Sequence, residues 1–316
     1  MQRNLGVTME TPDLSVSRNA YAKVNLGLSV LGRRSDGYHE VSTVMVAVGL
    51  YDRIYVTRDS GELSVFCPRL PHLPQETNLA YRGAKAYLES VGENLAFTIR
   101  IDKNIPVGAG MGGGSSDAAA AMLALRELTG KGEIADLMNV AAGLGADVPF
   151  LTGCNENPPL WEAAVCTGIG EKVAPLCVKP FWLVVAFLKT GVSTPWAFRT
   201  WDEHNSASDV PDSADVDPRS AKVVAALAAG DPVILSQAIY NDLERAVVLH
   251  RPDIRRAKEL LVGSGALNAV MTGSGSAVYG VCRSREDALG VRERARRAAG
   301  NTEIHGLSVI RTGVLG

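Results

Sequence analysis

The sequence has little of what a membrane protein, a nucleic-acid-binding protein or a secreted protein needs. Its longest apolar runs, Phe181–Leu188 and Ala118–Leu125, contain eight residues each, whereas a membrane-spanning helix needs about 20. Lys and Arg number 32 against 34 Asp and Glu, a formal net charge of −2, so there is no basic surplus for nucleic acid or an anionic membrane. The five cysteines form no CxxC pair, and no signal peptide is visible in Met1–Ser17. We therefore expect a cytoplasmic protein with reduced thiols.

The composition suits a soluble protein with a sizeable core. The chain has 316 residues, 46 % of them apolar and 21 % charged, which is enough for about two domains. The composition shifts to Gly, Asn, Glu and Pro around Thr152–Pro159. We place the boundary there and predict domains over residues 1–157 and 158–316. The mixture of strand and helix patterns predicts an α/β or α+β fold with two lobes.

The periodicity of apolar residues locates the elements. Strands or strand–turn segments are predicted over residues 21–31, 41–48, 53–57, 97–101, 181–188 and 269–281, and helices over 78–91, 116–128, 133–144, 221–229, 232–246, 253–262 and 285–299. The acidic, Ser- and Pro-rich stretch Asp202–Ser220 is predicted to be a solvated loop rather than a partner site.

The strongest local signal is a glycine-rich loop, Ile105–Asp117, between a predicted strand and a predicted helix. Five glycines in this loop lack a Cβ atom, so the backbone can turn sharply and approach a ligand. The N–H groups at the start of the following helix favour an anion such as phosphate. The alternative is a tight turn that binds nothing. The spacing does not fit a dinucleotide fold, there is no Walker A lysine, and protein-kinase signatures are absent.

The loop and three other segments resemble the GHMP small-molecule kinases, which include galactokinase, homoserine kinase and mevalonate kinase. The second family motif is similar to Pro106–Ser116, and Leu144–Pro149 and Thr272–Ala277 follow in the expected order. Two further segments, Ala22–Leu28 and Asp36–Glu40, resemble the members that use ATP to phosphorylate the 2-hydroxyl of a cytidine diphosphate alcohol on the non-mevalonate route to isoprenoid precursors. The resemblance extends from about Arg18 to the C-terminus.

The resemblance implies a fold and a set of site residues. The fold is a ribosomal-S5-domain-2-like N-terminal lobe and a ferredoxin-like C-terminal lobe, with the active site in the cleft between them. The implied ATP-binding residues are Lys103, Pro106, Val107, Gly108, Ala109, Gly110, Met111, Gly112, Gly113, Gly114, Ser115, Ser116, Gly273 and Gly275. The implied substrate-binding residues are Asn25, Tyr38, His39, Thr194 and Phe198, with Tyr38 and Phe198 on opposite faces of the cytosine.

Lys23 and Asp147 are the implied catalytic pair, and the chemistry agrees with that assignment. Phosphoryl transfer from ATP to an alcohol needs a base for the hydroxyl proton and a positive charge near the transferring group. Asp147 can serve as the base and Lys23 can supply the charge. Mg²⁺ should accompany ATP, but its ligands have no spacing signature. Each of the two residues, taken alone, is more often a member of a surface ion pair.

Two alternatives stay open at this point. The chain could be another alcohol kinase of the same fold, acting on homoserine or mevalonate, or a nucleotide-binding regulator that has lost catalysis. Two local features depart from the family: Met111 stands where Leu is common, and the stretch Cys154–Trp161 looks longer than usual. We expect a small-molecule substrate, no nucleic-acid or membrane partner, and a monomer or weak homodimer.

Overall fold

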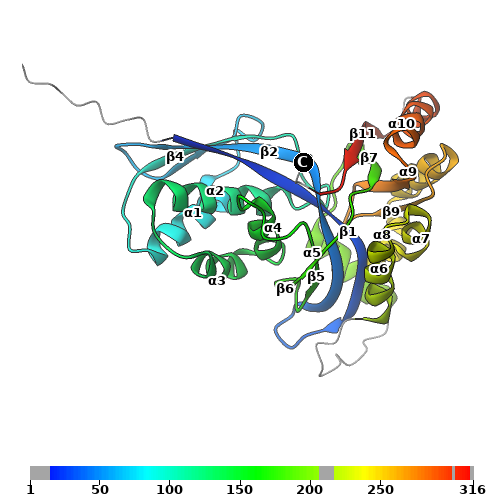
Figure 1. The fold of residues 1–316 in the computed structure, drawn as a ribbon, viewed down its shortest axis with the longest axis horizontal. Coiled ribbons are helices and arrows are strands. Elements are labelled where there is room, and N and C mark those ends of the chain that lie inside the picture. Colours follow the sequence, from blue (N-terminus) through cyan, green and yellow to red (C-terminus); the bar gives the residue numbers. More distant parts are fainter. Residues whose placement is uncertain (1–14, 206–216, 301–302, 314–316) are drawn as a thin grey trace, which may run out of the picture.

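A computed structural model describes residues 15–205, 217–300 and 303–313. Figure 1 shows two lobes, one built around α1 to α4 and the other around α5 to α10, with the long strands β1 and β2 running between them. The predicted mixed α/β fold with two lobes is confirmed.

The sheet of the N-terminal lobe is built on two long antiparallel strands, β1 (Ser15–Arg33) and β2 (His39–Arg58). The strands predicted over 41–48 and 53–57 are one strand, so their separation was wrong. The register shifts between the pairs Ala22↔Val48 and Tyr21↔Tyr51, which leaves two residues of β2 in a bulge. A bulge bends a strand without ending it. The other strands are β3 (Ser64–Phe66), β4 (Phe97–Asp102), β5 (Ala163–Thr167), β6 (Lys172–Leu176) and β8 (Tyr240–Asn241).

Helices cover one face of the left-hand part of this sheet in Figure 1. They are the short 3₁₀ helix η1 (Gln75–Thr77), α1 (Leu79–Ser90), α2 (Gly113–Thr129), α3 (Ile134–Leu144) and α4 (Val148–Asn155). Asn78 caps α1 by accepting a hydrogen bond from the Ala80 N–H at 2.9 Å. The helices predicted over 78–91, 116–128 and 133–144 are confirmed, but α4 was not predicted.

The C-terminal lobe has an antiparallel sheet in the order β11-β7-β10-β9. Its strands are β7 (Trp182–Leu188), β9 (Asn268–Met271), β10 (Val278–Cys282) and β11 (Ile304–Arg311). With helices between β7 and β9 and between β10 and β11, this is the order of a ferredoxin-like unit. The helices are α5 (Thr194–His204), α6 (Pro218–Ala229), α7 (Pro232–Ala238), α8 (Asp242–His250), α9 (Pro252–Gly263) and α10 (Arg285–Ala299).

The single helix predicted over 232–246 was wrong. Ile239 leaves the helical conformation, and β8 pairs in parallel with β1 before α8 begins. Asn241 then caps α8 by accepting a hydrogen bond from the Leu243 N–H at 3.0 Å, a helix start that an unbroken apolar pattern conceals. The two ends of the loop predicted over Asp202–Ser220 belong to α5 and α6, and its middle, residues 206–216, lies outside the described residues.

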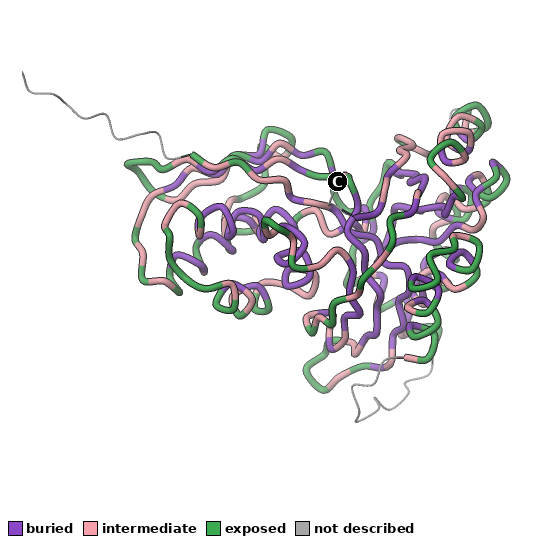
Figure 2. Tube along the Cα trace, in the orientation of Figure 1, coloured by how far each residue is buried: buried purple, intermediate pink, exposed green. Residues whose placement is uncertain are grey.

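The two lobes share a core. Apolar residues of β1 and β2, including Val24 and Val46, pack in one buried cluster with Met111 of the glycine loop and with Leu183 and Tyr279 of the second sheet. Figure 2 shows this buried chain where the lobes meet. The first sheet also takes up β5 and β6, which follow the predicted boundary at residue 157. The lobes are therefore fused through packed side chains, and the boundary at residue 157 stays a prediction.

Candidate active site

A cavity of about 470 Å³ collects most of the predicted site residues. Its walls come from β1, the glycine loop, the junction of α3 and α4, the segment before α5 and the turn after β9. The predicted residues that line it are Lys23, Asn25, Lys103, Pro106, Val107, Gly108, Ala109, Gly110, Met111, Gly112, Gly113, Gly114, Ser115, Asp147, Thr194, Phe198 and Gly273. The structure thus places residues from both ends of the chain around one cavity.

The glycine loop has the backbone conformation that its sequence predicts. Gly108, Gly110 and Gly112 have φ angles of +69°, +75° and +73°, a region that residues with a Cβ rarely adopt. A Cβ on Gly110 would lie 2.3 Å from the carbonyl oxygen of Thr272, so only glycine fits there. Gly112 occupies the N-cap position of α2 without a side chain. The first N–H groups of α2 are therefore available to an anion.

Backbone hydrogen bonds attach this loop to the C-terminal lobe. The Gly108 carbonyl accepts from the N–H groups of Val192 and Ser276, both at 3.2 Å, and the Ala109 carbonyl accepts from the Ala277 N–H at 3.1 Å. On the other side, the Lys23 N–H donates to the Met111 carbonyl at 3.0 Å. The loop is therefore held between the two lobes.

Lys23 and Asp147 form an ion pair at the cavity wall. The Lys23 Nζ lies 3.3 Å from the Asp147 Oδ2, and the two side chains are 4 % and 30 % exposed. Asp147 follows the end of α3, as predicted, and also precedes α4 at its N-cap position. It makes no side-chain cap there, which leaves its carboxylate free to face Lys23. The α4 N-terminus favours a negative charge at this position.

Asn25 holds the Lys23 ammonium from the next position on the same face of β1. The Lys23 Nζ donates to the Asn25 Oδ1 at 2.6 Å, and the Asn25 amide nitrogen donates to the Thr43 Oγ1 at 2.9 Å. The Asn25 N–H donates to the Thr272 Oγ1 at 3.0 Å. A Cβ on Gly273 would lie 3.3 Å from the Lys23 Nζ. The turn after β9 therefore closes directly over the ammonium group.

Lys103 lies in a different environment. Its ammonium donates to the Asp52 Oδ2 at 2.5 Å and to the Asp117 Oδ2 at 2.7 Å, and all three side chains are buried. Burial lowers the pKa of Lys103, but the charges of Asp117 and Asp52 outweigh it, so this pKa lies above its ordinary value. Burial raises the pKa of Asp117 to about 7, and the Asp117 Oδ1 has no hydrogen-bond partner among the described residues.

Asp52 extends this buried cluster into the start of the loop. Its Oδ1 accepts hydrogen bonds from the N–H groups of Asn104 and Ile105, at 2.5 and 2.8 Å. The Lys103 ammonium is therefore neutralised within the protein, and Asp52 fixes the backbone that leads into the glycine loop.

Two predicted ATP-binding residues do not line the cavity. The Ser116 hydroxyl donates to the Tyr21 carbonyl at 2.7 Å and accepts from the Asn155 amide at 2.9 Å. It thus holds the first turn of α2 against β1. Gly275 packs behind the loop, where a Cβ would lie 2.7 Å from the Met271 sulfur. Both residues support the cavity from outside in this structure.

One apolar wall of the cavity was missed by sequence reasoning. It includes Cys67, Leu70, Leu73 and Leu79, opposite the exposed Val107 of the loop. Burial raises the pKa of the Cys67 thiol, which keeps it neutral. Cys67, Leu70 and Leu73 lie in irregular segments between β3 and η1, where apolar periodicity gives no signal, whereas Leu79 is the first residue of α1.

The predicted cytosine pocket is assembled only in part. The His39 and Phe198 rings are stacked, with centroids 4.7 Å apart and planes inclined by 23°. The Thr194 Oγ1 lies 2.9 Å from the Ser274 Oγ at the cavity wall. Tyr38, in contrast, is 61 % exposed. Tyr38 and His39 are not among the described residues that line the cavity, so the cytosine-binding role of these residues stays a prediction.

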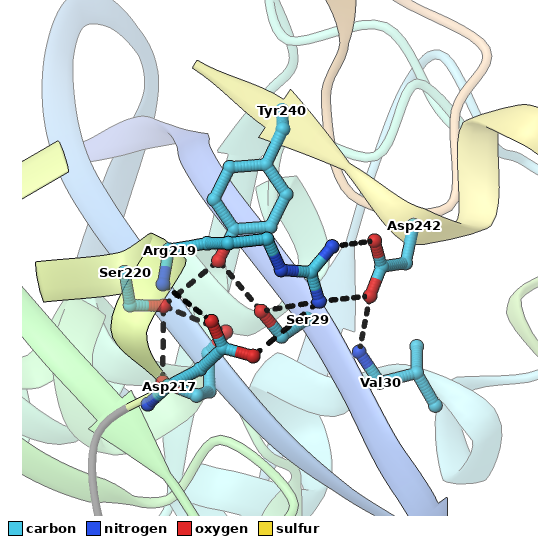
Figure 3. Close-up of polar contacts among 8 residues, drawn as sticks. Ser29, Val30, Asp217, Arg219, Ser220, Tyr240 and Asp242 are labelled. Carbon is cyan, nitrogen blue, oxygen red and sulfur yellow. Dashed lines mark hydrogen bonds and ion pairs between the residues drawn. The ribbon is translucent and has the colours of Figure 1, made fainter. Parts of the chain in front are cut away.

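Figure 3 shows a polar cluster beside the cavity-lining part of β1. Arg219, at the start of α6, donates to both oxygens of Asp242, at 2.6 and 2.8 Å, and lies over the Tyr240 ring. Asp242 accepts from the Val30 N–H at 3.1 Å, and the Tyr240 hydroxyl lies 2.6 Å from the Ser29 Oγ. The hydrogen bonds to Asp242 raise the pKa of Arg219. The cluster ties the starts of α6 and α8 to β1, and nothing in the sequence predicted it.

The long stretch 154–161 folds back onto α4. The Trp161 indole N–H donates to the Phe150 carbonyl at 2.9 Å, and its ring covers Gly153, where a Cβ would lie 2.2 Å from ring atoms. Trp161 therefore supports α4, the helix that begins after Asp147, and the greater length of the stretch relative to the family stays an expectation.

In the part of the chain that the structure describes, no three His, Cys, Asp or Glu side chains are grouped to hold a metal ion. No described helix is both long and apolar enough to cross a membrane.

Comparisons with known proteins agree with this geometry. The profile of the GHMP kinases N terminal domain matches residues 78–153, and that of the GHMP kinases C terminal domain matches residues 223–301. A homoserine kinase from Cytophaga hutchinsonii has the same fold, with a TM-score of 0.70 at 20 % identity over 96 % of each chain. The fold and the glycine loop thus define an ATP-dependent small-molecule kinase of the GHMP class.

Proteins with higher sequence identity show which family within this class the chain belongs to. A protein of Symbiobacterium thermophilum named 4-diphosphocytidyl-2-C-methyl-D-erythritol kinase is 42 % identical over 87 % of this chain and 94 % of its own length. A protein of the same name from Desulfitobacterium hafniense is 42 % identical over 85 % and 88 %. A crystal structure of 4-(cytidine 5'-diphospho)-2C-methyl-D-erythritol kinase matches with a TM-score of 0.75 and 34 % identity, over 95 % of this chain and all of that one. The chain belongs to the 4-diphosphocytidyl-2-C-methyl-D-erythritol kinase family.

Proposed function

We propose that this protein transfers the γ-phosphoryl group of ATP to the 2-hydroxyl of 4-diphosphocytidyl-2-C-methyl-D-erythritol, giving the 2-phosphate and ADP in the non-mevalonate route to isoprenoid precursors. The observation that carries the proposal is the Lys23–Asp147 pair, 3.3 Å apart, in the cavity that the glycine loop also lines. Family membership and this pair together favour an active kinase over a regulator.

The glycine loop would hold the phosphates of ATP. Gly112 leaves the N-terminus of α2 without a side-chain cap, so its N–H groups and the helix dipole can bind the phosphate oxygens. The apolar wall at Leu70 and Leu73 lies in the same cavity and would take the adenine. Triphosphate and purine would then lie along one continuous surface.

Lys23 and Asp147 would act on the acceptor hydroxyl. The Asp147 carboxylate accepts its proton as the bond to phosphorus forms, late in the transfer, when charge accumulates on the phosphoryl group. The Lys23 ammonium, held by Asn25, stabilises that charge and lowers the pKa of the hydroxyl. Because both groups already lie at the cavity wall, little reorganisation precedes the reaction.

Mg²⁺ would accompany ATP, and the available donor set fits it. Mg²⁺ usually binds one or two carboxylates together with phosphates and waters. Of the two carboxylates that line the cavity, Asp147 is assigned to the acceptor hydroxyl and is paired with Lys23, whereas the Asp117 Oδ1 has no hydrogen-bond partner among the described residues. Asp117 is therefore the carboxylate that would hold the ion. The ion neutralises charge on the phosphate oxygens when it is bound.

The cytidine end of the substrate would lie against Phe198 and His39. The exposed Tyr38 can close over the base, and stacking on an aromatic ring contributes about 1–3 kcal/mol per base. Tyr38→Ala should therefore raise the KM for the cytidine substrate by about tenfold or more and leave the KM for ATP nearly unchanged. Equal damage to both KM values would contradict this role.

The test of the proposal is a coupled assay of ADP release with Mg-ATP and four alcohols: 4-diphosphocytidyl-2-C-methyl-D-erythritol, homoserine, mevalonate and galactose. Turnover confined to the cytidine compound is the expected result. Turnover with another alcohol would agree with ATP binding at the glycine loop and would contradict the proposed cytidine site. ATP binding without turnover of any of the four would favour the regulator. The proposal uses side chains of one chain only, in keeping with the monomer or weak homodimer expected in the cytoplasm.

A further inference from the structure

His39 has a carboxylate partner that the proposed reaction has not yet used. The His39 Nε2 lies 2.7 Å from the Asp202 Oδ1, and the two side chains are 8 % and 29 % exposed. His39 begins β2, whereas Asp202 lies on α5, 163 positions along the chain. No described residue provides a partner for the His39 Nδ1.

Three residues of α5 surround the imidazole. Phe198 stacks on it, Trp201 meets it edge-on with ring centroids 5.9 Å apart, and Asp202 binds its Nε2. Positions three and four apart lie on one face of a helix, so a single face of α5 fixes the plane, the edge and the hydrogen bonding of His39. Such complete support is expected where the orientation of a ring matters.

The Asp202 contact also decides which imidazole nitrogen carries the proton. A carboxylate only accepts hydrogen bonds, so Nε2 must be the protonated nitrogen facing Asp202. In the neutral ring Nδ1 is then an acceptor with a free lone pair. The edge of His39 that Asp202 does not cover therefore offers an acceptor rather than a donor.

We propose that Asp202 is a positioning residue that makes the site accept cytosine and reject uracil. This inference rests on the proposed function. Cytosine carries an amino group at C4, which donates, whereas uracil carries a carbonyl there, which accepts. An Nδ1 acceptor pairs with the amino group, and it places two lone pairs against each other when the base is uracil.

The stacking geometry leaves part of the Phe198 ring uncovered by His39. A centroid separation of 4.7 Å between nearly parallel rings is an offset stack, so His39 covers only part of the Phe198 face. A base lying beside the imidazole, in its plane, would cover the rest and present its edge to His39. Phe198 also lines the main cavity, which connects this base position to the reaction site.

The experiment compares kcat/KM for the cytidine substrate and for its uridine analogue in the wild type and in Asp202→Asn. An asparagine side chain can present either its oxygen or its amide N–H to Nε2, so it no longer fixes the proton. The preference for cytidine should fall by about 5- to 100-fold, as expected when a buried donor or acceptor is left unpaired. The KM for ATP should stay as in the wild type.

Glu203→Gln is the matched control. Glu203 is the next residue of α5 and is exposed, so this variant removes a carboxylate from the same helix without touching His39. Its base preference should equal that of the wild type. An equal loss of preference in both variants would overturn the proposal, because helix charge alone would then explain it. Asp202→Glu keeps an acceptor and should restore a substantial part of the preference.

A measurement on the wild type does not depend on any variant folding. The ¹⁵N chemical shifts of the His39 ring should show the proton on Nε2 in the neutral form, and a proton on Nδ1 would overturn the proposal. The proposed function and the role of Asp202 can be contradicted separately. If the wild type turns over neither nucleotide alcohol, the proposed function fails. If it turns over the cytidine compound and Asp202→Asn keeps the full base preference, only the role of Asp202 fails.

Discussion

Two buried lysines of the N-terminal lobe differ in the residues that surround them, and this difference gives them different roles. Lys23 and Lys103 have nearly the same side-chain exposure, 4 % and 6 %. Lys23 has a neutral amide and one carboxylate, and that carboxylate is itself 30 % exposed. Lys103 has two carboxylates, both buried. The charge of Lys23 therefore remains available to a ligand, whereas the charge of Lys103 is consumed within the protein.

The contrast separates Lys23, the proposed reacting group, from Lys103, which supports the structure. Sequence reasoning grouped Lys103 with the nucleotide-contacting residues, and the structure gives it a second task, because Asp52 joins it to the backbone at the start of the glycine loop. A positive charge that is already paired can do little for a phosphate, but it can fix the loop that does. Four variants test this division of roles.

The largest effect is expected at the partner of Lys23. Asp147→Asn should lower kcat by about 10²- to 10⁴-fold, the usual contribution of a general base, because an amide cannot accept the hydroxyl proton. The KM values should change little. Steady-state kinetics on a variant with a normal thermal unfolding curve measures this effect. A kcat near that of the wild type would show that Asp147 is not the base.

Lys103→Met tests the supporting lysine. Removing one partner of a buried ion pair typically costs about 3–5 kcal/mol, and here two buried carboxylates would face each other without a cation. Urea unfolding followed by circular dichroism measures the loss. Lys85→Met is the control. The Lys85 side chain is 60 % exposed and its Nζ lies 4.0 Å from the Glu89 Oε1, and such a surface pair contributes about 0–1 kcal/mol to stability. Equal stability of the two variants would remove the distinction drawn above.

Lys23→Met should show the opposite pattern. We expect kcat to fall by about 10²- to 10³-fold, as when one group that stabilises a developing negative charge is removed. The free energy of unfolding should change by less than in Lys103→Met, because the remaining Asp147 is partly solvated. The same two assays decide the question. If Lys23→Met lost much stability but kept the wild-type kcat per folded molecule, Lys23 would have a structural role like that of Lys103.

Asp117→Asn should change the pH dependence of stability. Burial raises the pKa of Asp117 to about 7 in the folded chain, against about 3.9 in an unfolded one. Between these pH values the folded state holds a proton that the unfolded state releases. This group therefore lowers the free energy of unfolding as pH rises from about 4 to about 7.

The amide has no such proton, so Asp117→Asn should gain stability relative to the wild type between pH 4.5 and pH 7.5, by roughly 3 kcal/mol. Urea unfolding of both proteins at the two pH values gives the difference. A constant difference between the two proteins would mean that Asp117 stays ionised throughout.

The parts that the sequence predicted well are those determined by local chemistry. The apolar periodicity over residues 78–91 predicts a helix, and α1 forms there. The glycines of Ile105–Asp117 indicate a sharply turning loop, and the structure has the positive φ angles and close backbone contacts that need residues without a Cβ. Lys23 and Asp147 were paired by the demands of the reaction together with the family resemblance.

The parts that it missed depend on contacts between distant segments. Asp52 lies 51 positions from Lys103 and Asp202 lies 163 positions from His39, so no spacing rule connects them. The bulge that makes β2 one strand and the pairing of β8 with β1 are also fixed by neighbours rather than by their own residues. The helix and strand propensities of individual residues contain no information about such contacts.

The backbone attachment of the glycine loop has a consequence for chimaeras. The three donors from the C-terminal lobe, Val192, Ser276 and Ala277, contribute main-chain N–H groups to the Gly108 and Ala109 carbonyls. Any amino acid except proline supplies such a donor. Lobes exchanged between relatives of similar fold can therefore keep these three hydrogen bonds even where their side chains differ, provided that the backbone path is retained. These three hydrogen bonds therefore depend on the backbone path and on the position of prolines, whereas the buried cluster shared by the two lobes still depends on matching side chains.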